Sequence, residues 1–178
     1  MTAGAGLVLA LDQGSHASRA VIFDSVGNQL TAAQVAVATR REGADPVEQD
    51  PEELVRSLQT ALADATESPA SVAILAAGLA TQRSTVVAWS RATGRALCDA
   101  LSWQDRRNAG ALAHLRPLAQ RVREITGLPL SPHYGASKLR WYLDHVPAVQ
   151  RAAVTGDLAC GPLSSFLVSR LVEERRCV

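Results

Sequence analysis

The chain has few of the residues that mark several classes of protein. Its three cysteines, Cys98, Cys160 and Cys177, are far apart and lack the spacing of zinc sites or disulfide frameworks. Lysine occurs once, at Lys138, and the net charge is +1, so the charge favours neither a nucleic acid nor an anionic membrane as a partner. No apolar run is long enough to span a membrane, and the first residues lack the basic segment of a signal peptide. We therefore expect a cytoplasmic protein with reduced thiols.

The residues from Leu7 to Asp24 predict two strands joined by a tight polar turn. The segments 7–11 and 20–23 are apolar without polar alternation, which is typical of strands that are covered on both faces. A third strand over 29–39 would complete an antiparallel meander.

The turn between the first two strands carries groups that suit a phosphate. We expect Gly14 to adopt a positive φ and to let the backbone come close to a ligand. Arg19 adds a fixed positive charge, and Asp12 ends the first strand, where a carboxylate can hold a hydrated Mg²⁺. N–H groups, a cation and a metal-binding carboxylate together predict a phosphate cradle. The alternative is an ordinary hairpin with a polar loop.

The remaining chain predicts a polar loop and then helices mixed with strands. Asp50 can cap a helix that begins at Pro51, with Glu53 at the reciprocal capping-box position. The expected strands cover 72–81, which is buried and parallel to the first, then 85–89, 97–103 and 154–158, and the expected loop covers 40–49. The expected helices cover 109–115, a segment from 117 that ends at Gly127, 136–144, a short segment from 147, and 162–174. This order predicts an RNase H-like α/β domain of the actin-like ATPase superfamily, with an antiparallel meander, parallel strands and flanking helices.

Four segments resemble motifs of the FGGY carbohydrate kinases, and of the glycerol kinases among them, in matching order and spacing. They are DQGSHASRAVIFD (12–24), GLATQRSTVVAWSRATGRAL (78–97), LSWQDRR (101–107) and TGLPLSPHYGASKLRWYLDHV (126–146). The resemblance runs from about Leu7 to the end of the chain. It implies an actin-like, two-domain kinase that moves the γ-phosphoryl group of MgATP to a hydroxyl group of a sugar or polyol.

The resemblance also implies roles for individual residues. Those that would face the ATP phosphates are Gly14, Ser15, His16, Ala17 and Arg19, with Asp12 near Mg²⁺ through water; those that would contact the substrate are Arg83, Ser84, Trp103 and His133. Arg83 would hydrogen-bond hydroxyl groups, and Trp103 would lie against the carbon backbone. From the residues alone, other interpretations stay open: His16 and His133 as plain loop residues, Arg83 as a solvated surface residue, Trp103 as half core, and 105–107 as a solvated helix start.

The chain departs from the glycerol kinases at several of these positions. They carry threonines at the positions of Ser15 and His16, a glutamate at that of Ser84 and a tyrosine at that of His133. A serine accepts hydroxyl hydrogen bonds less strongly than a carboxylate, and the loss of a buried charged acceptor costs about 1.5–3 kcal/mol. We therefore expect the substrate to be a sugar or polyol other than glycerol.

The family's general-base aspartate, in a Gly-Asp-Gln context, has no match in this chain. We expect residues 1–178 to be the N-terminal substrate-binding domain of an FGGY carbohydrate kinase without its nucleotide-binding C-terminal domain, and to be inactive alone. A separate chain would supply the second domain, or the chain would form a homodimer. The alternatives are a non-catalytic sugar- or phosphate-binding module, and an RNase H-like nuclease, which would need several carboxylates around paired metals.

Overall fold

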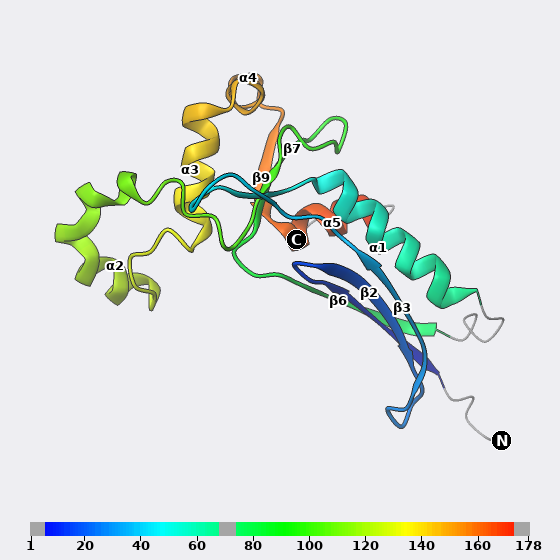
Figure 1. Cartoon of the computed structure of the whole chain (residues 1–178). Helices are drawn as coiled ribbons and strands as arrows, with labels where there is room; N and C mark the ends of the chain where they lie inside the picture. The colour runs from blue at the N-terminus through cyan, green and yellow to red at the C-terminus, as the bar shows by residue number, and fades with distance from the viewer. Residues whose placement is uncertain (1–5, 68–73, 173–178) are drawn as a thin grey trace.

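The computed structural model describes residues 6–67 and 74–172, which build two sheets with helices packed around them (Figure 1). The first sheet has the strand order β3-β2-β1-β6, and the second has the order β4-β5-β8-β7-β9. In Figure 1 the first sheet forms the lower part of the molecule, and the second lies above it. The candidate site lies where the two sheets meet.

The first sheet contains the predicted meander. β1 (Leu7–Gln13), β2 (Ala17–Phe23) and β3 (Gln29–Ala36) are antiparallel, and β6 (Ile74–Thr81) runs parallel to β1. The antiparallel meander and the parallel pairing are therefore confirmed. β1 and β2 extend further into the loop than predicted, because Asp12 pairs with Arg19 and Gln13 with Ser18 in the strand register.

Helix α1 (Pro51–Thr66) covers one face of this sheet, because Leu54, Leu58 and Ala61 recur at helical spacing and are fully buried. Its start is capped as predicted, since the Asp50 carboxylate accepts a hydrogen bond from the Glu52 N–H at 2.8 Å. The predicted capping box is wrong, because the Glu53 carboxylate accepts from the Ala38 N–H instead. Glu53 thus holds the segment after β3 against the helix.

The second sheet is built from short strands, and the sequence predicted it in part. It consists of β4 (Arg40–Arg41), β5 (Val47–Gln49), β7 (Val86–Ser90), β8 (Ala100–Leu101) and β9 (Leu158–Pro162). The expected loop over 40–49 is wrong, since two of these strands lie in it. The expected strand over 154–158 is also wrong, because α4 (Pro147–Thr155) ends at Gly156, whose φ is +76°, and β9 starts only after it.

The remaining helices follow the predicted order. They are the 3₁₀ helix η2 (Gly110–Leu118), which continues through Pro117 into α2 (Ala119–Thr126), then α3 (Gly135–His145), and α5 (Leu163–Leu171), which follows β9. Gly127 ends α2 in the left-handed conformation, as predicted. η2 and α2 bury no residue and project from the molecule (Figure 1), whereas Phe166 of α5 packs edge-on against Trp89 in the core.

β6 differs from its prediction as a buried strand. It stands at the edge of the first sheet, and the side chain of Leu75 is 79% exposed. Its apolar composition correctly predicted a strand, but composition cannot show whether a neighbour covers it. None of the helices formed by residues 6–67 and 74–172 is long and apolar enough to cross a membrane. The predicted end of the last helix at Glu174 lies outside the described residues.

Candidate functional site

The loop between β1 and β2 consists of Gly14, Ser15 and His16. It is a tight turn, closed by a hydrogen bond of 2.9 Å from the Gly14 N–H to the Ala17 carbonyl oxygen. The expected positive φ at Gly14 is wrong, because this bond closes the turn without a left-handed residue. Glycine is still required for space, since a Cβ atom there would lie 3.1 Å from the same carbonyl oxygen.

The charged residues of the predicted cradle pair with each other. Arg19 and Asp12 lie opposite each other on neighbouring strands, with Nη1 and Oδ2 3.1 Å apart, and Arg19 Nε also donates to Gln34 Oε1. Both members of the pair are about half exposed, and such ion pairs contribute at most about 1 kcal/mol. Either side chain is therefore free to turn toward a ligand. Mg²⁺ often uses one carboxylate and several waters, so the exposed Asp12 fits a water-mediated role.

Ala17 and His16, which were also predicted to face the phosphates, differ in burial. Ala17 is buried at the start of β2, so its side chain faces the core rather than a ligand. The His16 side chain is exposed and, within the described residues, makes no hydrogen bond, while its carbonyl oxygen accepts from the Val37 N–H at 3.0 Å. This bond ties the loop to the segment that follows β3.

Two glutamines that were not predicted from the sequence, Gln49 and Gln82, form hydrogen bonds that support this loop. Gln49 Nε2 donates to the Ser15 carbonyl oxygen at 3.1 Å, and Gln82 Nε2 donates to Gln49 Oε1 at 2.7 Å. The Gln82 backbone N–H donates to the Gln13 carbonyl oxygen at 3.0 Å. The sequence offered one weak signal, which is a polar amide directly after the apolar run that forms β6.

Trp103 joins the predicted substrate residues to the phosphate loop. Its indole Nε1–H donates to Ser15 Oγ at 2.9 Å, and its backbone N–H donates to Thr85 Oγ1, also at 2.9 Å. The His133 ring meets the indole edge-on, with 5.9 Å between the ring centroids. The structure thus brings Ser15, Trp103 and His133 together, although they come from three distant segments.

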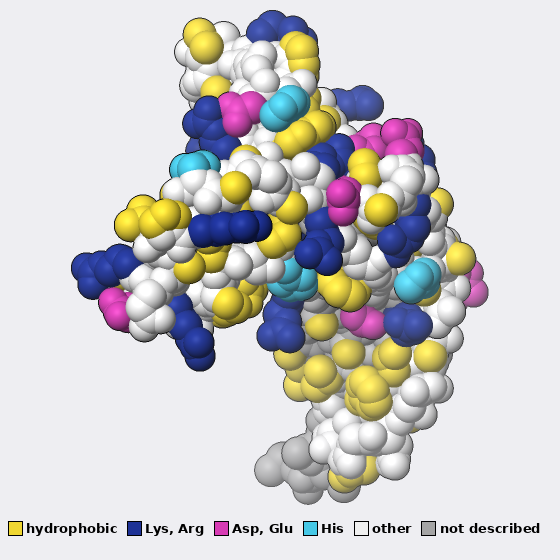
Figure 2. Space-filling model, turned by 60° about the vertical axis from the view of Figure 1, so that its left-hand side comes forward, with side chains coloured by type: hydrophobic (Ala, Val, Ile, Leu, Met, Phe, Trp, Pro, Cys, Tyr) yellow, Lys and Arg dark blue, Asp and Glu magenta, His cyan; other side chains and the backbone are white. Residues whose placement is uncertain are grey.

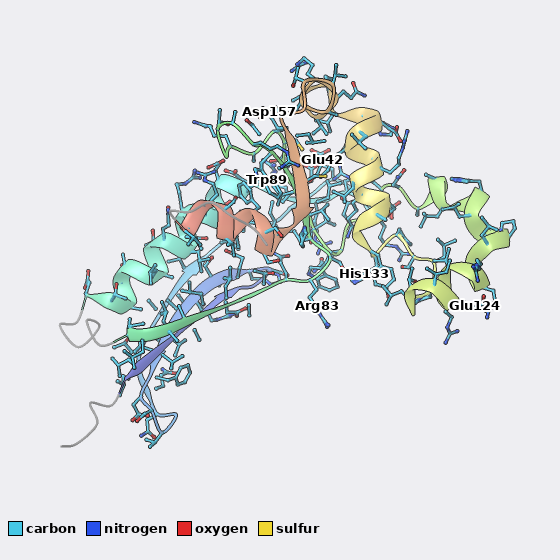
Figure 3. All side chains as sticks on the ribbon, turned by 180° about the vertical axis from the view of Figure 1, so that it is seen from behind. Glu42, Arg83, Trp89, Glu124, His133 and Asp157 are labelled. Carbon is cyan, nitrogen blue, oxygen red and sulfur yellow. The ribbon has the colours of Figure 1, made fainter. Side chains whose placement is uncertain are left out.

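A shallow cavity of about 390 Å³ opens beside this contact. It is lined by Trp103, Gln104, Arg106, Ser131 and His133. Figure 3 shows the labelled side chains of Arg83 and His133 on the same side of the molecule. Figure 2 shows basic and histidine side chains gathered near the middle of this face, where the lower part of the molecule joins the upper part. The position and size suit a small polar ligand.

The run from Asp105 to Arg107 separates into two parts. Asp105 is 1% exposed, so the expected solvated helix start is wrong; its carboxylate accepts from the Val47 N–H at 2.7 Å and pairs with Arg107. The Arg107 guanidinium also pairs with Glu48 and lies 4.5 Å from the Trp141 ring centroid. These groups fix the wall of the site, and Arg106 alone of the run lines the cavity.

The buried Lys138 and the partly buried Cys98 have shifted pKa values. Burial lowers the pKa of the Lys138 ammonium to about 8, and the nearby Asp105 carboxylate opposes that shift. Burial raises the pKa of the Cys98 thiol to about 12, so this cysteine is unreactive at neutral pH. Cys160 is an exposed free thiol, and Cys177 lies outside the described residues.

Known structures share this architecture. A Plasmodium falciparum glycerol kinase with ADP superimposes with a TM-score of 0.84 at 20% identity, over 94% of this chain and 34% of that one. A gluconate kinase from Lactobacillus acidophilus gives a TM-score of 0.78 at 18% identity, over 95% and 34% of the two chains. These likenesses define the class of fold, and they confirm the predicted RNase H-like, actin-like α/β domain.

The family follows from the sequence comparisons. The family model of the FGGY carbohydrate kinases, N-terminal domain, matches residues 7–177. The chain is 42% identical to a glycerol kinase of Aromatoleum aromaticum over 170 residues, and 40% identical to one of Verminephrobacter eiseniae over 174 residues. These alignments cover 92% and 95% of this chain but 34% of each relative, so the chain spans about a third of their length. The chain belongs to the FGGY family of carbohydrate kinases, and it matches the N-terminal domain of that family.

Proposed function

We propose that this chain is the substrate-binding N-terminal domain of an ATP-dependent carbohydrate kinase. It would hold a sugar or polyol in the cavity beside Trp103 and present the β1–β2 loop to the terminal phosphates of MgATP. The observation that carries the proposal is the hydrogen bond between Trp103 Nε1 and Ser15 Oγ, because it joins a residue of the proposed substrate side to a residue of the proposed phosphate loop. Phosphoryl transfer depends on such positioning more than on covalent chemistry by the protein.

On the phosphate side, the loop N–H groups and the Arg19 guanidinium would bind anionic oxygens, with Asp12 holding Mg²⁺ through water. The side chains of Ser15 and His16 would add further donors. Bound MgATP would supply the γ-phosphoryl group and neutralise its developing charge. The adenine and the general base would come from a second domain, in the same protein or in a separate chain, so residues 1–178 alone would turn over slowly or not at all.

On the substrate side, Arg83 would donate hydrogen bonds to hydroxyl groups, and the Trp103 ring would lie against the carbon chain. Ser84 and His133 would complete the pocket. The resemblance assigns a glutamate to the glycerol kinases at position 84, and a serine cannot replace the charged acceptor. We therefore propose a preference for a sugar or polyol other than glycerol.

Isothermal titration calorimetry of the chain with glycerol, D-xylulose and D-gluconate tests the substrate site. We expect saturable binding of at least one compound, with glycerol not the tightest. Arg83→Ala should weaken it at least tenfold, whereas Arg121→Ala, an exposed control on α2, should leave it unchanged. An absence of binding by the whole set, or equal effects of the two variants, would contradict the substrate assignment.

A second candidate function is a non-catalytic sugar- or phosphate-binding module. It is favoured by Ser84 and His133, which stand at positions where the resemblance gives the glycerol kinases a glutamate and a tyrosine. An ADP-release assay with ATP, Mg²⁺ and the tightest sugar, in the presence of the separately expressed remainder of a related kinase, separates the two functions. Turnover in the mixture supports the kinase domain; sugar binding without turnover supports the module.

A further inference from the structure

Lys138 is buried on α3, and no carboxylate of the described residues forms a hydrogen bond with it. Its side chain is 1% exposed, and Nζ donates to the carbonyl oxygens of Ser84 at 2.9 Å and His133 at 2.7 Å. A buried lysine is usually paired with an acid, because burying an unpaired charge is costly. Here the ammonium donates hydrogen bonds to the backbone of two loops, and both loops carry residues predicted to contact the substrate.

The first of these loops holds a backbone conformation that serine rarely adopts. Within the described residues, Ser84 is the only residue other than glycine with a positive φ, at 64°. The left-handed region is strained for an L-residue with a side chain. A hydrogen bond from a charged donor is stronger than one from a neutral donor, so the bond from Lys138 can offset this strain. The ammonium is therefore placed to keep the turn at Ser84 in one conformation.

The second loop is fastened to the first turn of α3. Besides the bond from Lys138, Ser137 Oγ lies 3.4 Å from the Pro132 carbonyl oxygen and 3.3 Å from that of Tyr134. The His133 N–H donates to Ser131 Oγ at 3.2 Å. Lys138 Nζ bonds to both this loop and the turn at Ser84, so it helps to set the distance between them.

We propose that Lys138 is a positioning residue of the substrate site, which holds Ser84 and His133 at a fixed separation beside Trp103. This inference rests on the proposed function for the meaning of the site. The ammonium itself does not reach the cavity; it acts through the backbone of the two loops. Its loss should release both loops while the helices and sheets stay folded.

A ligand-free experiment tests this positioning. Lys138→Met removes the donors at similar length, and Tyr142→Phe is the control, because its buried hydroxyl on the same helix bonds to Val86, Asp99 and Leu101 instead of the site loops. In ¹⁵N–¹H spectra we expect Lys138→Met to shift or broaden the amide signals of Ser84 and His133 and the Trp103 indole signal. Unchanged signals, or the same changes in Tyr142→Phe, would overturn the proposal.

The wild-type chain provides a second test that needs no variant to fold. The ammonium loses its proton near its lowered pKa of about 8, in the field of the buried Asp105 carboxylate. The ¹³C′ signals of Ser84 and His133 should then shift together between pH 7 and 9.5, with a common midpoint. If neither carbonyl signal moves in this range, Lys138 does not hold the loops.

Sugar affinity links the positioning to the site. Lys138→Met should weaken binding of the tightest compound at least tenfold. Tyr142→Phe should weaken it less than threefold, and the melting temperatures of the two variants show whether they are equally well folded. Equal losses would reduce Lys138 to a structural role. If the wild type binds none of the compounds, the proposed function fails, whereas the two spectroscopic tests still decide the role of Lys138.

Discussion

The indole N–H of Trp103 donates to the hydroxyl group of Ser15 at 2.9 Å, although the two residues are 88 positions apart in the chain. One partner lies in the β1–β2 loop, and the other follows β8. The bond joins two loops that the proposed function assigns to different ligands.

Removing either partner of this bond should cost little stability on its own. Trp103→Phe keeps an aromatic ring and loses the donor, and Ser15→Ala loses the acceptor. A neutral hydrogen bond contributes about 0.5–1.5 kcal/mol, so we expect a coupling energy near the lower end for this partly exposed pair. Urea unfolding of the two single variants and the double variant measures it. Strict additivity would show that the bond is not formed in solution.

Gln49→Glu should destabilise the fold much more than Gln34→Glu. The Gln49 amide is buried and donates to the Ser15 carbonyl oxygen, so a carboxylate there would keep the donor Gln82 Nε2 but would place a negatively charged oxygen against that carbonyl oxygen. Losing the donor and burying a charge should cost on the order of 3 kcal/mol. Gln34 is an exposed partner of Arg19, and its change should stay within about 0.5 kcal/mol. Chemical denaturation checks both values; equal effects would contradict the buried amide network.

Gly135→Ala should loosen the contact between α3 and β7. A Cβ atom at this position would lie 2.9 Å from Val86 Cγ1, and the buried valine has little room to move. Overpacking of this kind costs about 1–3 kcal/mol. Gly110→Ala is the matched control, since a Cβ atom there meets nothing within 4 Å, and it should be neutral or slightly stabilising. Melting temperatures of the two variants decide the comparison.

The unfolding free energy should depend on pH through Lys138. Burial lowers the pKa of this ammonium to about 8 from an ordinary value of 10.5, so between these values the unfolded state binds more protons than the folded state. Stability from this group therefore rises with pH in that window, by at most about 1.4 kcal/mol per unit. Lys138→Met should lack the rise.

The quantity to measure is the difference in unfolding free energy between the wild type and Lys138→Met as a function of pH. Burial raises the pKa values of Cys98 and Tyr142, and these groups lower stability at alkaline pH in both proteins. Subtracting the unfolding free energy of Lys138→Met from that of the wild type removes their contribution. A difference that stays flat from pH 7.5 to 10 would show that the lysine is not desolvated.

The sequence was sufficient for elements whose own residues determine them. The apolar runs of β1, β2 and β6 predicted strands, and the Asp50-Pro51 start predicted α1, because local pattern and capping decide such elements. β4 and β5 are two and three residues long and are held by pairing with neighbouring strands, so the local pattern over 40–49 does not predict them. The expected strand over 97–103 is present only as the two residues of β8. The edge position of β6 is likewise a property of its neighbours.

The same division holds for the site. The resemblance of the motifs selected Ser15, Trp103 and His133, and the fold places these side chains in contact. It did not select Gln49 or Lys138, because these side chains act through hydrogen bonds to carbonyl oxygens of other segments of the chain. Burial of Asp105 was missed for a similar reason, since its partner is the Val47 N–H of another strand.

The framework that carries the Ser15 loop consists of uncharged amides and hydroxyl groups, those of Gln49, Gln82 and Thr85. None of these groups gains or loses a proton between pH 4 and 10, whereas a phosphate monoester changes charge near pH 6. The shape of this loop should accordingly stay constant while the ionic state of a bound phosphate varies. Acid sensitivity of anion binding would then arise from the ionisation of the ligand and not from a change in these amide and hydroxyl groups.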